Sequence, residues 1–189
     1  MIKHKDNPIS IRSKKWFVAS LLQLMQEKPF EKITISEIAK RADLDRSTFY
    51  RNFDSKEDLL RLYIDDIAKE YVNRLVRIEN INMNKVADIF LSLMQEHEIF
   101  IVTLKKHGLS NLLLDSFNTY LPQIHEITKE QFPQSISDDV LHYALAYNAG
   151  GMWNMLMLWI DKQQTNSYKD LLKAFKEISS FNMSQIKRS

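Results

Sequence analysis

The stretch of residues 34–60, TISEIAKRADLDRSTFYRNFDSKEDLL, constrains the fold most, because it holds start signals for three helices in close succession. Thr34 and Glu37 have the spacing of a capping box, in which each side chain satisfies a backbone N–H of the other residue. The pattern predicts a helix that begins near Ile35.

The next signals predict a sharp turn and two further helices. Asp43 tolerates the left-handed backbone that a tight helix-to-helix turn requires, and Asp45 can then cap a short helix over residues 46–53. Ser55, with Asp58 three residues later, starts another helix at once.

Two short helices joined by a tight turn form a helix-turn-helix, whose second helix enters the major groove of DNA. The helix over residues 46–53 suits that role, since most of its positions are polar, and Phe49 and Phe53 suffice to anchor it. Arginine is the usual partner of guanine, so the candidates for contacts to base edges are Arg46, Ser47 and Arg51.

The same stretch closely resembles the TetR family of bacterial transcriptional regulators. The resemblance spans roughly residues 10 to 62 and rests on Thr34, Glu37, Ile38, Ala39, the Ala42-Asp43-Leu44 turn, Ser47-Thr48-Phe49-Tyr50, Phe53 and Ser55-Lys56-Glu57-Asp58-Leu59. The family usually has glycine where this chain has Asp43; we expect a slight loss of stability there and no change of fold.

The resemblance extends the predicted DNA-binding set beyond the base-contacting candidates. Matching positions in the family often touch phosphate, which implies that role for Thr34, Thr48, Tyr50 and Lys56. Ser36, Asp45 and Asn52 complete the predicted set.

Composition supports an all-α fold. Three glycines and four prolines in 189 residues are too few turn-formers for an all-β protein, while apolar residues recur at helical spacing. We expect about nine helices in all: a three-helix DNA-binding domain over residues 1–60 and a larger helical regulatory and dimerisation domain over residues 61–189.

The chain has no cysteine and no run of 18 apolar residues, so we expect a soluble, cytoplasmic protein without a membrane partner. Its net charge is +2, but residues 1–56 carry +5 and the remainder about −3. A basic head on a mildly acidic body is what a DNA-binding domain joined to a second domain would show.

Several helix boundaries follow from caps and breakers. We expect a flexible arm over residues 1–9, a first helix from Ser10 or Ser13, a helix over residues 56–80, and one over residues 85–107 with a bend near His97. Later helices are expected over residues 110–132, kinked or shortened by Pro122, then from Ser137, and from Ser167 to about Met183.

The stretch YALAYNAGGMWNMLMLWI, residues 143–160, combines small residues with two adjacent glycines. Glycine disfavours a helix by about 1 kcal/mol relative to alanine, which suggests a close approach to a second copy or, alternatively, burial within one subunit. In the family the last two long helices pair across a dimer. The expected interface comprises Ala149, Gly150, Gly151, Trp153, Leu156, Leu171 and Phe175.

Aromatic and methionine residues in the second domain suggest a pocket for an apolar or aromatic effector. The expected lining is Tyr63, Phe90, Met94, Phe100, Phe117, Tyr120, Tyr143 and Tyr147. Residues 143–159 also resemble the regulatory domain of the dihydroxyacetone-kinase operon activators, a subgroup in which a protein partner can replace the small ligand.

No catalytic residue, metal site or cofactor is expected. Neither His97-Glu98 nor His125-Glu126 completes the HExxH pattern, and Gly150-Gly151 lacks the residues of a phosphate loop. We expect a homodimeric repressor that binds an inverted repeat in double-stranded DNA and responds to an effector. The alternatives are an activator controlled by a protein co-regulator and an architectural DNA-binding factor.

Overall fold

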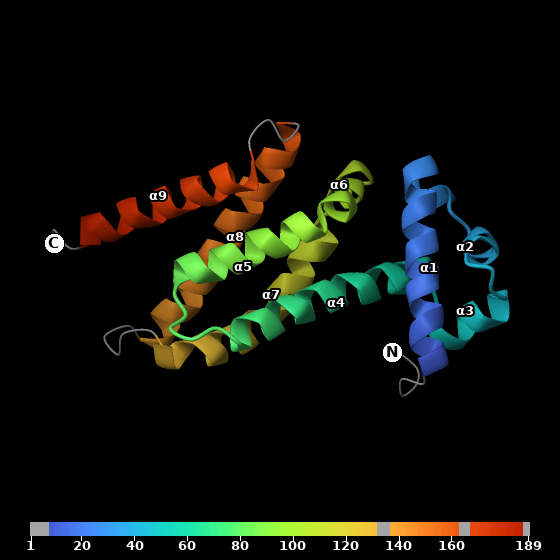
Figure 1. Ribbon diagram of the computed structural model, residues 1–189, viewed down its shortest axis with the longest axis horizontal. Coiled ribbons are helices and arrows are strands. Elements are labelled where there is room, and N and C mark those ends of the chain that lie inside the picture. Colours follow the sequence, from blue (N-terminus) through green and yellow to red (C-terminus); the bar gives the residue numbers. More distant parts are fainter. Residues whose placement is uncertain (1–7, 132–136, 163–166, 187–189) are drawn as a thin grey trace. The chain divides into compact units, whose positions relative to one another are not determined.

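The computed structural model describes residues 8–131, 137–162 and 167–186, and these residues form nine α-helices, two short 3-10 helices and no strand (Figure 1). The predicted all-α fold is therefore confirmed. None of the described helices combines the length and apolar character that a membrane crossing requires. The elements are α1 (Pro8–Glu27), η1 (Phe30–Lys32), α2 (Ile35–Arg41), α3 (Arg46–Asn52), α4 (Lys56–Val76), α5 (Met83–Glu96), α6 (Glu98–Lys106), α7 (Asn111–Thr128), η2 (Lys129–Gln131), α8 (Asp138–Asp161) and α9 (Tyr168–Ile186).

The chain divides into two compact units. Unit 1 comprises the described part of Met1–Asp66 together with Ile99–Leu113, and unit 2 comprises Ile67–Glu98 with the described part of Leu114–Ser189. Almost all of α6 thus belongs with the N-terminal helices. The boundary expected between residues 60 and 61 stays a prediction.

Helix α1 begins at Pro8, so the start predicted at Ser10 or Ser13 is wrong. Proline suits the first position of a helix, because its fixed φ is already helical and its missing N–H would have no partner there. Residues 1–7 of the expected arm lie outside the described residues.

Two of the three predicted side-chain caps around the short helices are formed. Thr34 Oγ1 accepts from the Glu37 N–H at 3.3 Å while a Glu37 carboxylate oxygen accepts from the Thr34 N–H at 2.9 Å. Asp43 has a φ of 53°, the left-handed conformation expected of the turn. Asp45 occupies the N-cap of α3 without a side-chain bond, whereas Ser55 and Asp58 bond reciprocally before α4.

An aromatic cluster forms the core of unit 1. The rings of Phe17 and Phe49 meet edge to face with centroids 5.2 Å apart, and Phe53 lies 5.4 Å from Phe49. All three are buried, so the anchoring role predicted for Phe49 and Phe53 is confirmed. Helix α1 contacts both α2 and α3, which lie on the same side of it in Figure 1.

The later helix boundaries follow the sequence signals with three adjustments. Helix α4 ends at Val76 rather than near residue 80, α7 continues through Pro122 to Thr128, and α9 extends to Ile186. The break expected near His97 is present, since His97 is the C-cap of α5. Ser137 accepts from the Val140 N–H and so caps α8 as predicted.

Unit 2 is held together by an aromatic triad and by ion pairs. Tyr71, Phe90 and Phe117 stand edge to face with centroid separations of 5.4 to 5.9 Å. Arg74 of α4 donates to Glu96 of α5 through both terminal nitrogens, at 2.7 and 2.6 Å. These contacts fix α4, α5 and α7 around one apolar interior.

Candidate functional site

Helix α3 presents polar side chains to solvent and is held to unit 1 by its apolar face. Phe49 is fully buried, whereas Arg46, Ser47, Tyr50 and Arg51 are exposed. A short helix anchored on one side and polar on the other can enter a DNA groove without loss of its own packing.

The two arginines of α3 are positioned by neighbouring side chains. Arg51 Nη2 donates to Thr48 Oγ1 at 2.8 Å, and its Nε donates to the Ser47 carbonyl at 3.3 Å. The guanidinium of Arg46 lies 5.9 Å from the centre of the Tyr50 ring. These contacts are exposed, so either guanidinium can exchange them for acceptors on DNA.

The remaining predicted DNA-binding residues divide into exposed and partly buried groups. Thr34, Ser36 and Asp45 are exposed. Asn52 is half-buried, because its Oδ1 accepts from Ser10 of α1 at 2.7 Å while its Nδ2 donates to the Thr48 carbonyl at 2.8 Å. Asn52 therefore links α3 to the start of α1.

Lys56 is occupied within the protein, which disagrees with its expected role as a phosphate contact. Its ammonium donates to the carbonyls of Phe30 at 2.6 Å, Ile33 at 2.9 Å and Glu31 at 3.1 Å. An ammonium group has three hydrogens, so these acceptors use its full donor capacity. The side chain joins the start of α4 to the segment before α2.

Two ion pairs fix the end of α1 against α2. Arg41 donates to both carboxylate oxygens of Glu27, at 2.7 and 2.8 Å, and Lys28 pairs with Glu37. The hydrogen bond from Lys28, together with those from Thr34, lowers the pKa of Glu37 to about 2. Glu37 thus both completes the capping box of α2 and, through Lys28, ties the end of α1 to α2.

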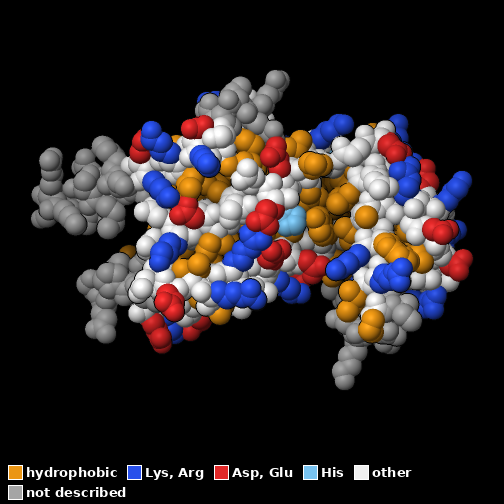
Figure 2. Space-filling model, viewed as in Figure 1, with side chains coloured by type: hydrophobic (Ala, Val, Ile, Leu, Met, Phe, Trp, Pro, Cys, Tyr) orange, Lys and Arg blue, Asp and Glu red, His pale blue; other side chains and the backbone are white. Residues whose placement is uncertain are grey.

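Charged side chains of both signs are interspersed over α1–α3 on the face shown in Figure 2, at its right. This face does not present a uniform basic field. Specific binding would therefore depend on individual contacts such as those of α3.

Unit 1 also contains a connection that the sequence did not reveal. His107 Nδ1 accepts from the Phe30 N–H at 3.3 Å, and Nε2 lies 2.8 Å from the Met25 carbonyl, to which it donates in the tautomer this geometry requires. Gln26 of α1 donates to Thr103 of α6. The partners lie 77 to 82 residues apart in sequence, so no local sequence pattern predicts these hydrogen bonds.

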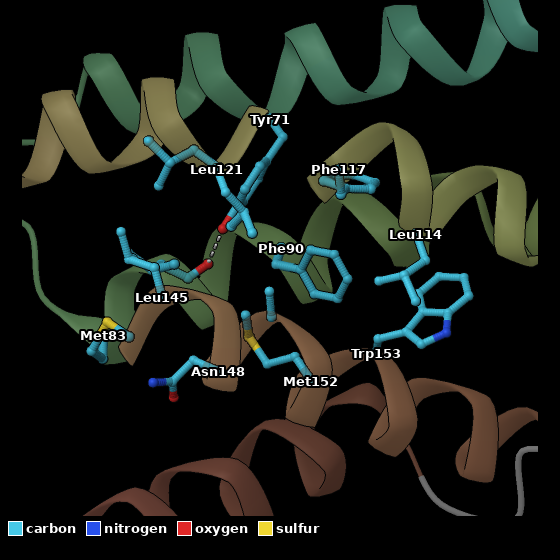
Figure 3. Close-up of a pocket in the computed structure, with 13 residues that line it drawn as sticks. Tyr71, Met83, Phe90, Leu114, Phe117, Leu121, Leu145, Asn148, Met152 and Trp153 are labelled. Atoms are coloured by element: carbon cyan, nitrogen blue, oxygen red, sulfur yellow. Dashed lines mark hydrogen bonds between the residues drawn. The ribbon is translucent and has the colours of Figure 1, made fainter. Parts of the chain in front are cut away.

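Unit 2 contains an apolar cavity of about 30 Å³ between four helices (Figure 3). Its wall includes Tyr71 of α4, Met83, Val86 and Phe90 of α5, and Leu114, Phe117, Leu121 and Ile124 of α7. Helix α8 contributes Leu145, Asn148, Ala149, Met152 and Trp153. No lysine, arginine or histidine is among these residues. The lining therefore suits an uncharged ligand or ligand segment.

Two of the residues expected in the pocket, Phe90 and Phe117, line this cavity. Tyr63 and Phe100 instead pack on each other in unit 1, with centroids 4.7 Å apart. The other expected residues are outside the lining: Met94 is fully buried, Tyr120 is half-buried, and Tyr143 and Tyr147 are exposed.

Each wall of the cavity, taken by itself, can be seen in the helical spacing of the sequence, whereas aromatic content does not mark it. Phe117, Leu121 and Ile124 recur at four and three residues on one face of α7, and Leu145, Asn148 and Met152 do the same on α8. What the sequence lacks is the information that these two faces meet.

The expected dimer residues divide between the interior of unit 2 and its surface. Trp153, Leu156 and Phe175 are buried within the chain, and Leu171 nearly so, which leaves them no surface for a partner in this conformation. Gly151 is exposed, and a Cβ added at Gly150 or Gly151 would meet no atom within 4 Å. The glycines therefore serve no close approach inside the described chain. Ala149 lines the cavity.

Comparison with known proteins identifies the N-terminal segment. Residues 18–63 match the family described as bacterial regulatory proteins, tetR family. This segment contains the second half of α1, all of α2 and α3, and the start of α4. The sequence has no significant match among curated proteins.

Solved structures resemble most of the chain. The dihydroxyacetone kinase operon activator DhaS has a TM-score of 0.65 at 21% identity, covering 93% of this chain and 96% of that chain. FadR from Bacillus subtilis, solved with stearoyl-CoA, has a TM-score of 0.63 at 14% identity over 87% of this chain and 96% of its own.

A regulator of the TerR/AcrR family from Aquifex aeolicus VF5 gives 0.63 at 19% identity, covering 89% and 98% respectively. These likenesses establish the fold. Residues 18–63, which carry the helix-turn-helix, are similar to the tetR family of bacterial regulatory proteins.

Proposed function

We propose that this protein is a homodimeric transcriptional repressor that binds an inverted-repeat operator and is released from it by a small apolar effector. The observation that carries the proposal is α3, whose exposed polar face stands on a fully buried Phe49 within the segment that matches the tetR family. Members of that family are regulatory proteins and not enzymes. A regulator of bacterial genes would act in the cytoplasm, where the DNA is.

In the proposed complex, Arg46, Ser47 and Arg51 read base edges from α3. Arg46 and Arg51 are exposed and can form the bidentate contact to guanine that is the commonest specific contact in the major groove. Thr34, Ser36, Thr48 and Tyr50 would contact the backbone. We no longer assign Lys56 to phosphate, because three carbonyls already occupy its ammonium.

The proposed dimer contact is an exposed face of α8. Large apolar side chains there are more than half exposed, and their spacing of three, four and eleven residues keeps them, with Gly151, on one side of the helix. This α8 face comprises Val140, Tyr143, Tyr147, Gly151 and Leu158. A patch of this kind marks an interaction surface, and the missing Cβ atoms at its centre would allow a partner helix to approach closely.

The proposed effector site is the cavity of unit 2. The fold is shared with FadR, whose structure holds stearoyl-CoA, a molecule with a long apolar segment. Here the lining is apolar, and Met83 and Met152 are flexible enough to enlarge a cavity of about 30 Å³ for a larger ligand. Binding would release the operator if the effector prefers the conformation that does not fit DNA.

A second candidate function is activation controlled by another protein. DhaS, named as an operon activator, resembles 93% of this chain. In that case the exposed tyrosines of α8 would contact the co-regulator, and the cavity would be part of the packing.

In vitro transcription from the promoter beside its own gene, with footprinting on the same DNA, tests the proposal. A repressor protects a short inverted repeat and lowers the transcript. A rise in transcript at the same footprint would favour the activator, and protection spread evenly along the DNA would indicate an architectural factor.

A further inference from the structure

The cavity of unit 2 contains one polar group that is placed to select a ligand. Tyr71 is 4% exposed, and its hydroxyl donates to the Val86 carbonyl across 3.4 Å, the dashed contact in Figure 3. Hydroxyl hydrogen bonds to oxygen usually measure 2.5 to 3.0 Å, so this bond is weak. Its donor is available to a stronger acceptor.

If the Tyr71 hydroxyl turned to donate to a ligand, the Val86 carbonyl would still have a hydrogen-bond partner. Val86 lies inside α5, where its carbonyl accepts the N–H of Phe90 four residues later as part of the helix. The phenol also stays protonated, since burial raises the pKa of Tyr71 well above its ordinary value. A ligand would therefore meet a neutral O–H donor.

The rest of the lining excludes charge. Two further lining side chains carry polar atoms. Asn148 is half-exposed, and its Nδ2 already donates to the Ala144 carbonyl at 2.7 Å, while Trp153 carries an indole N–H, a neutral donor that brings no charge. A carboxylate or phosphate inside would have no cation to pair with, which strongly disfavours its burial.

We infer that the effector places in this cavity an uncharged apolar group bearing one oxygen acceptor, such as a ketone, ester or thioester carbonyl, and that Tyr71 donates the hydrogen bond that recognises it. The inference rests on the proposed function and names the ligand class of its effector site. An anionic portion of the same molecule would remain outside the cavity.

Three small probes of similar shape separate the possibilities: acetophenone carries a neutral acceptor, ethylbenzene carries none, and benzoate carries a charge. Calorimetric titration of the full chain without DNA should show that Tyr71→Phe weakens acetophenone about three- to tenfold and leaves ethylbenzene unchanged. Benzoate should bind at least tenfold more weakly than acetophenone to the unsubstituted protein.

Tyr168→Phe is the matched control. Tyr168 is also a buried tyrosine of unit 2, its hydroxyl has no hydrogen-bond partner among the described residues, and it is not part of the cavity lining. Its loss should change the affinity for none of the probes. The inference would be overturned if both substitutions weakened acetophenone equally, or if Tyr71→Phe left its affinity unchanged. It would also be overturned if benzoate bound as tightly as acetophenone, or if no probe bound.

A second measurement does not depend on the variant folding. The infrared carbonyl stretch of 13C-labelled acetophenone bound to the unsubstituted protein should lie below its position in hexane, because a donated hydrogen bond weakens the C=O bond. A stretch at the hexane position would contradict the assignment. Operator binding by the same preparation is measured separately. If the protein binds the operator but none of the probes, only the proposed ligand class is wrong. If it binds the probes as expected but not the operator, the proposed regulatory function is wrong.

Discussion

The ammonium of Lys56 donates to the carbonyl of Phe30 at 2.6 Å and lies 4.6 Å from the centre of the Phe30 ring. With the Glu31 and Ile33 carbonyls as further acceptors, this side chain connects the first turn of α4 to the 3-10 segment before α2. It orients the helix-turn-helix from inside unit 1.

Lys56→Ala should therefore lower stability more than it lowers affinity for DNA. A hydrogen bond to a charged group contributes about 1.5 to 3 kcal/mol net of water exchange, and water can reach part of the freed carbonyls in the variant. We therefore expect the free energy of unfolding to fall by about 2 kcal/mol. Urea denaturation followed by circular dichroism measures the change. Lys40→Ala, at an exposed lysine of α2, is the control and should change stability by less than about 0.5 kcal/mol. Unchanged stability with uniformly weaker DNA binding would restore the phosphate role.

His107→Ala should loosen the attachment of α6 within unit 1. The ring satisfies the Phe30 N–H and meets the Met25 carbonyl, and loss of both contacts should reduce the free energy of unfolding by about 1 to 2 kcal/mol. Hydrogen exchange at the Phe30 amide reports the effect directly. His142→Ala, at an exposed histidine, should leave that amide protected as before. Equal protection in His107→Ala would show that the contact carries no stability.

The capping box should make unit 1 sensitive to acid in a defined window. The hydrogen bonds from Lys28 and Thr34 depress the pKa of Glu37 from about 4.5 to about 2 in the folded state. A depressed pKa contributes stability above the unfolded value, which is lost as pH falls through the folded value. The melting temperature should therefore fall between about pH 4.5 and pH 2, and Glu37→Gln should flatten that slope. An identical slope in the variant would assign it to other carboxylates.

Substitutions on α8 should separate folding from dimerisation. Gly151→Ala adds a methyl group into open space, so the free energy of unfolding of the single chain should rise by about 0.5 to 1 kcal/mol. Tyr147→Lys should weaken the dimer about tenfold or more, since tyrosine commonly contributes above 1 kcal/mol to an interface. Urea denaturation measures the change in Gly151→Ala, and sedimentation equilibrium measures the dimer constant of Tyr147→Lys.

Val76→Lys serves as the control for Tyr147→Lys, because Val76 is also an exposed apolar residue but lies on α4. It should leave the dimer constant unchanged. An unchanged dimer dissociation constant in Tyr147→Lys would show that this face of α8 is not part of the interface.

The parts of the structure that sequence predicted are those set by neighbours in the chain. The capping box of Thr34 and Glu37 and the left-handed Asp43 each depend on residues within a few positions, and each is present. The assignments of Lys56 and the cavity lining required long-range information. The acceptors of Lys56 lie 23 to 26 residues upstream, and Tyr71 and Trp153 line the same cavity only because the fold brings α4 and α8 to it.

The residues of α8 that were expected at the dimer interface also show that sequence patterns do not reveal long-range packing. Small-residue content correctly marked the helix as unusual, but it could not tell which side of the helix the chain itself would cover. Trp153 and Leu156 face the interior, while Tyr143 and Tyr147 face outward. Hydrophobicity alone does not distinguish these positions, since both pairs are large and apolar.

Sequence-specific DNA recognition by α3 is tested most directly by titrating the protein against a fluorescent duplex from the region beside its own gene. A random duplex of equal length is titrated in parallel, and both titrations are repeated at several salt concentrations. If α3 reads the operator, two chains bind each inverted repeat, with affinity at least a thousandfold above that for random DNA. Arg46→Ala or Arg51→Ala should then weaken binding to the specific site by about 1 to 3 kcal/mol, while binding to random DNA changes little. Equal affinity for the two duplexes, or equal weakening on both by the arginine substitutions, would contradict sequence-specific recognition by α3.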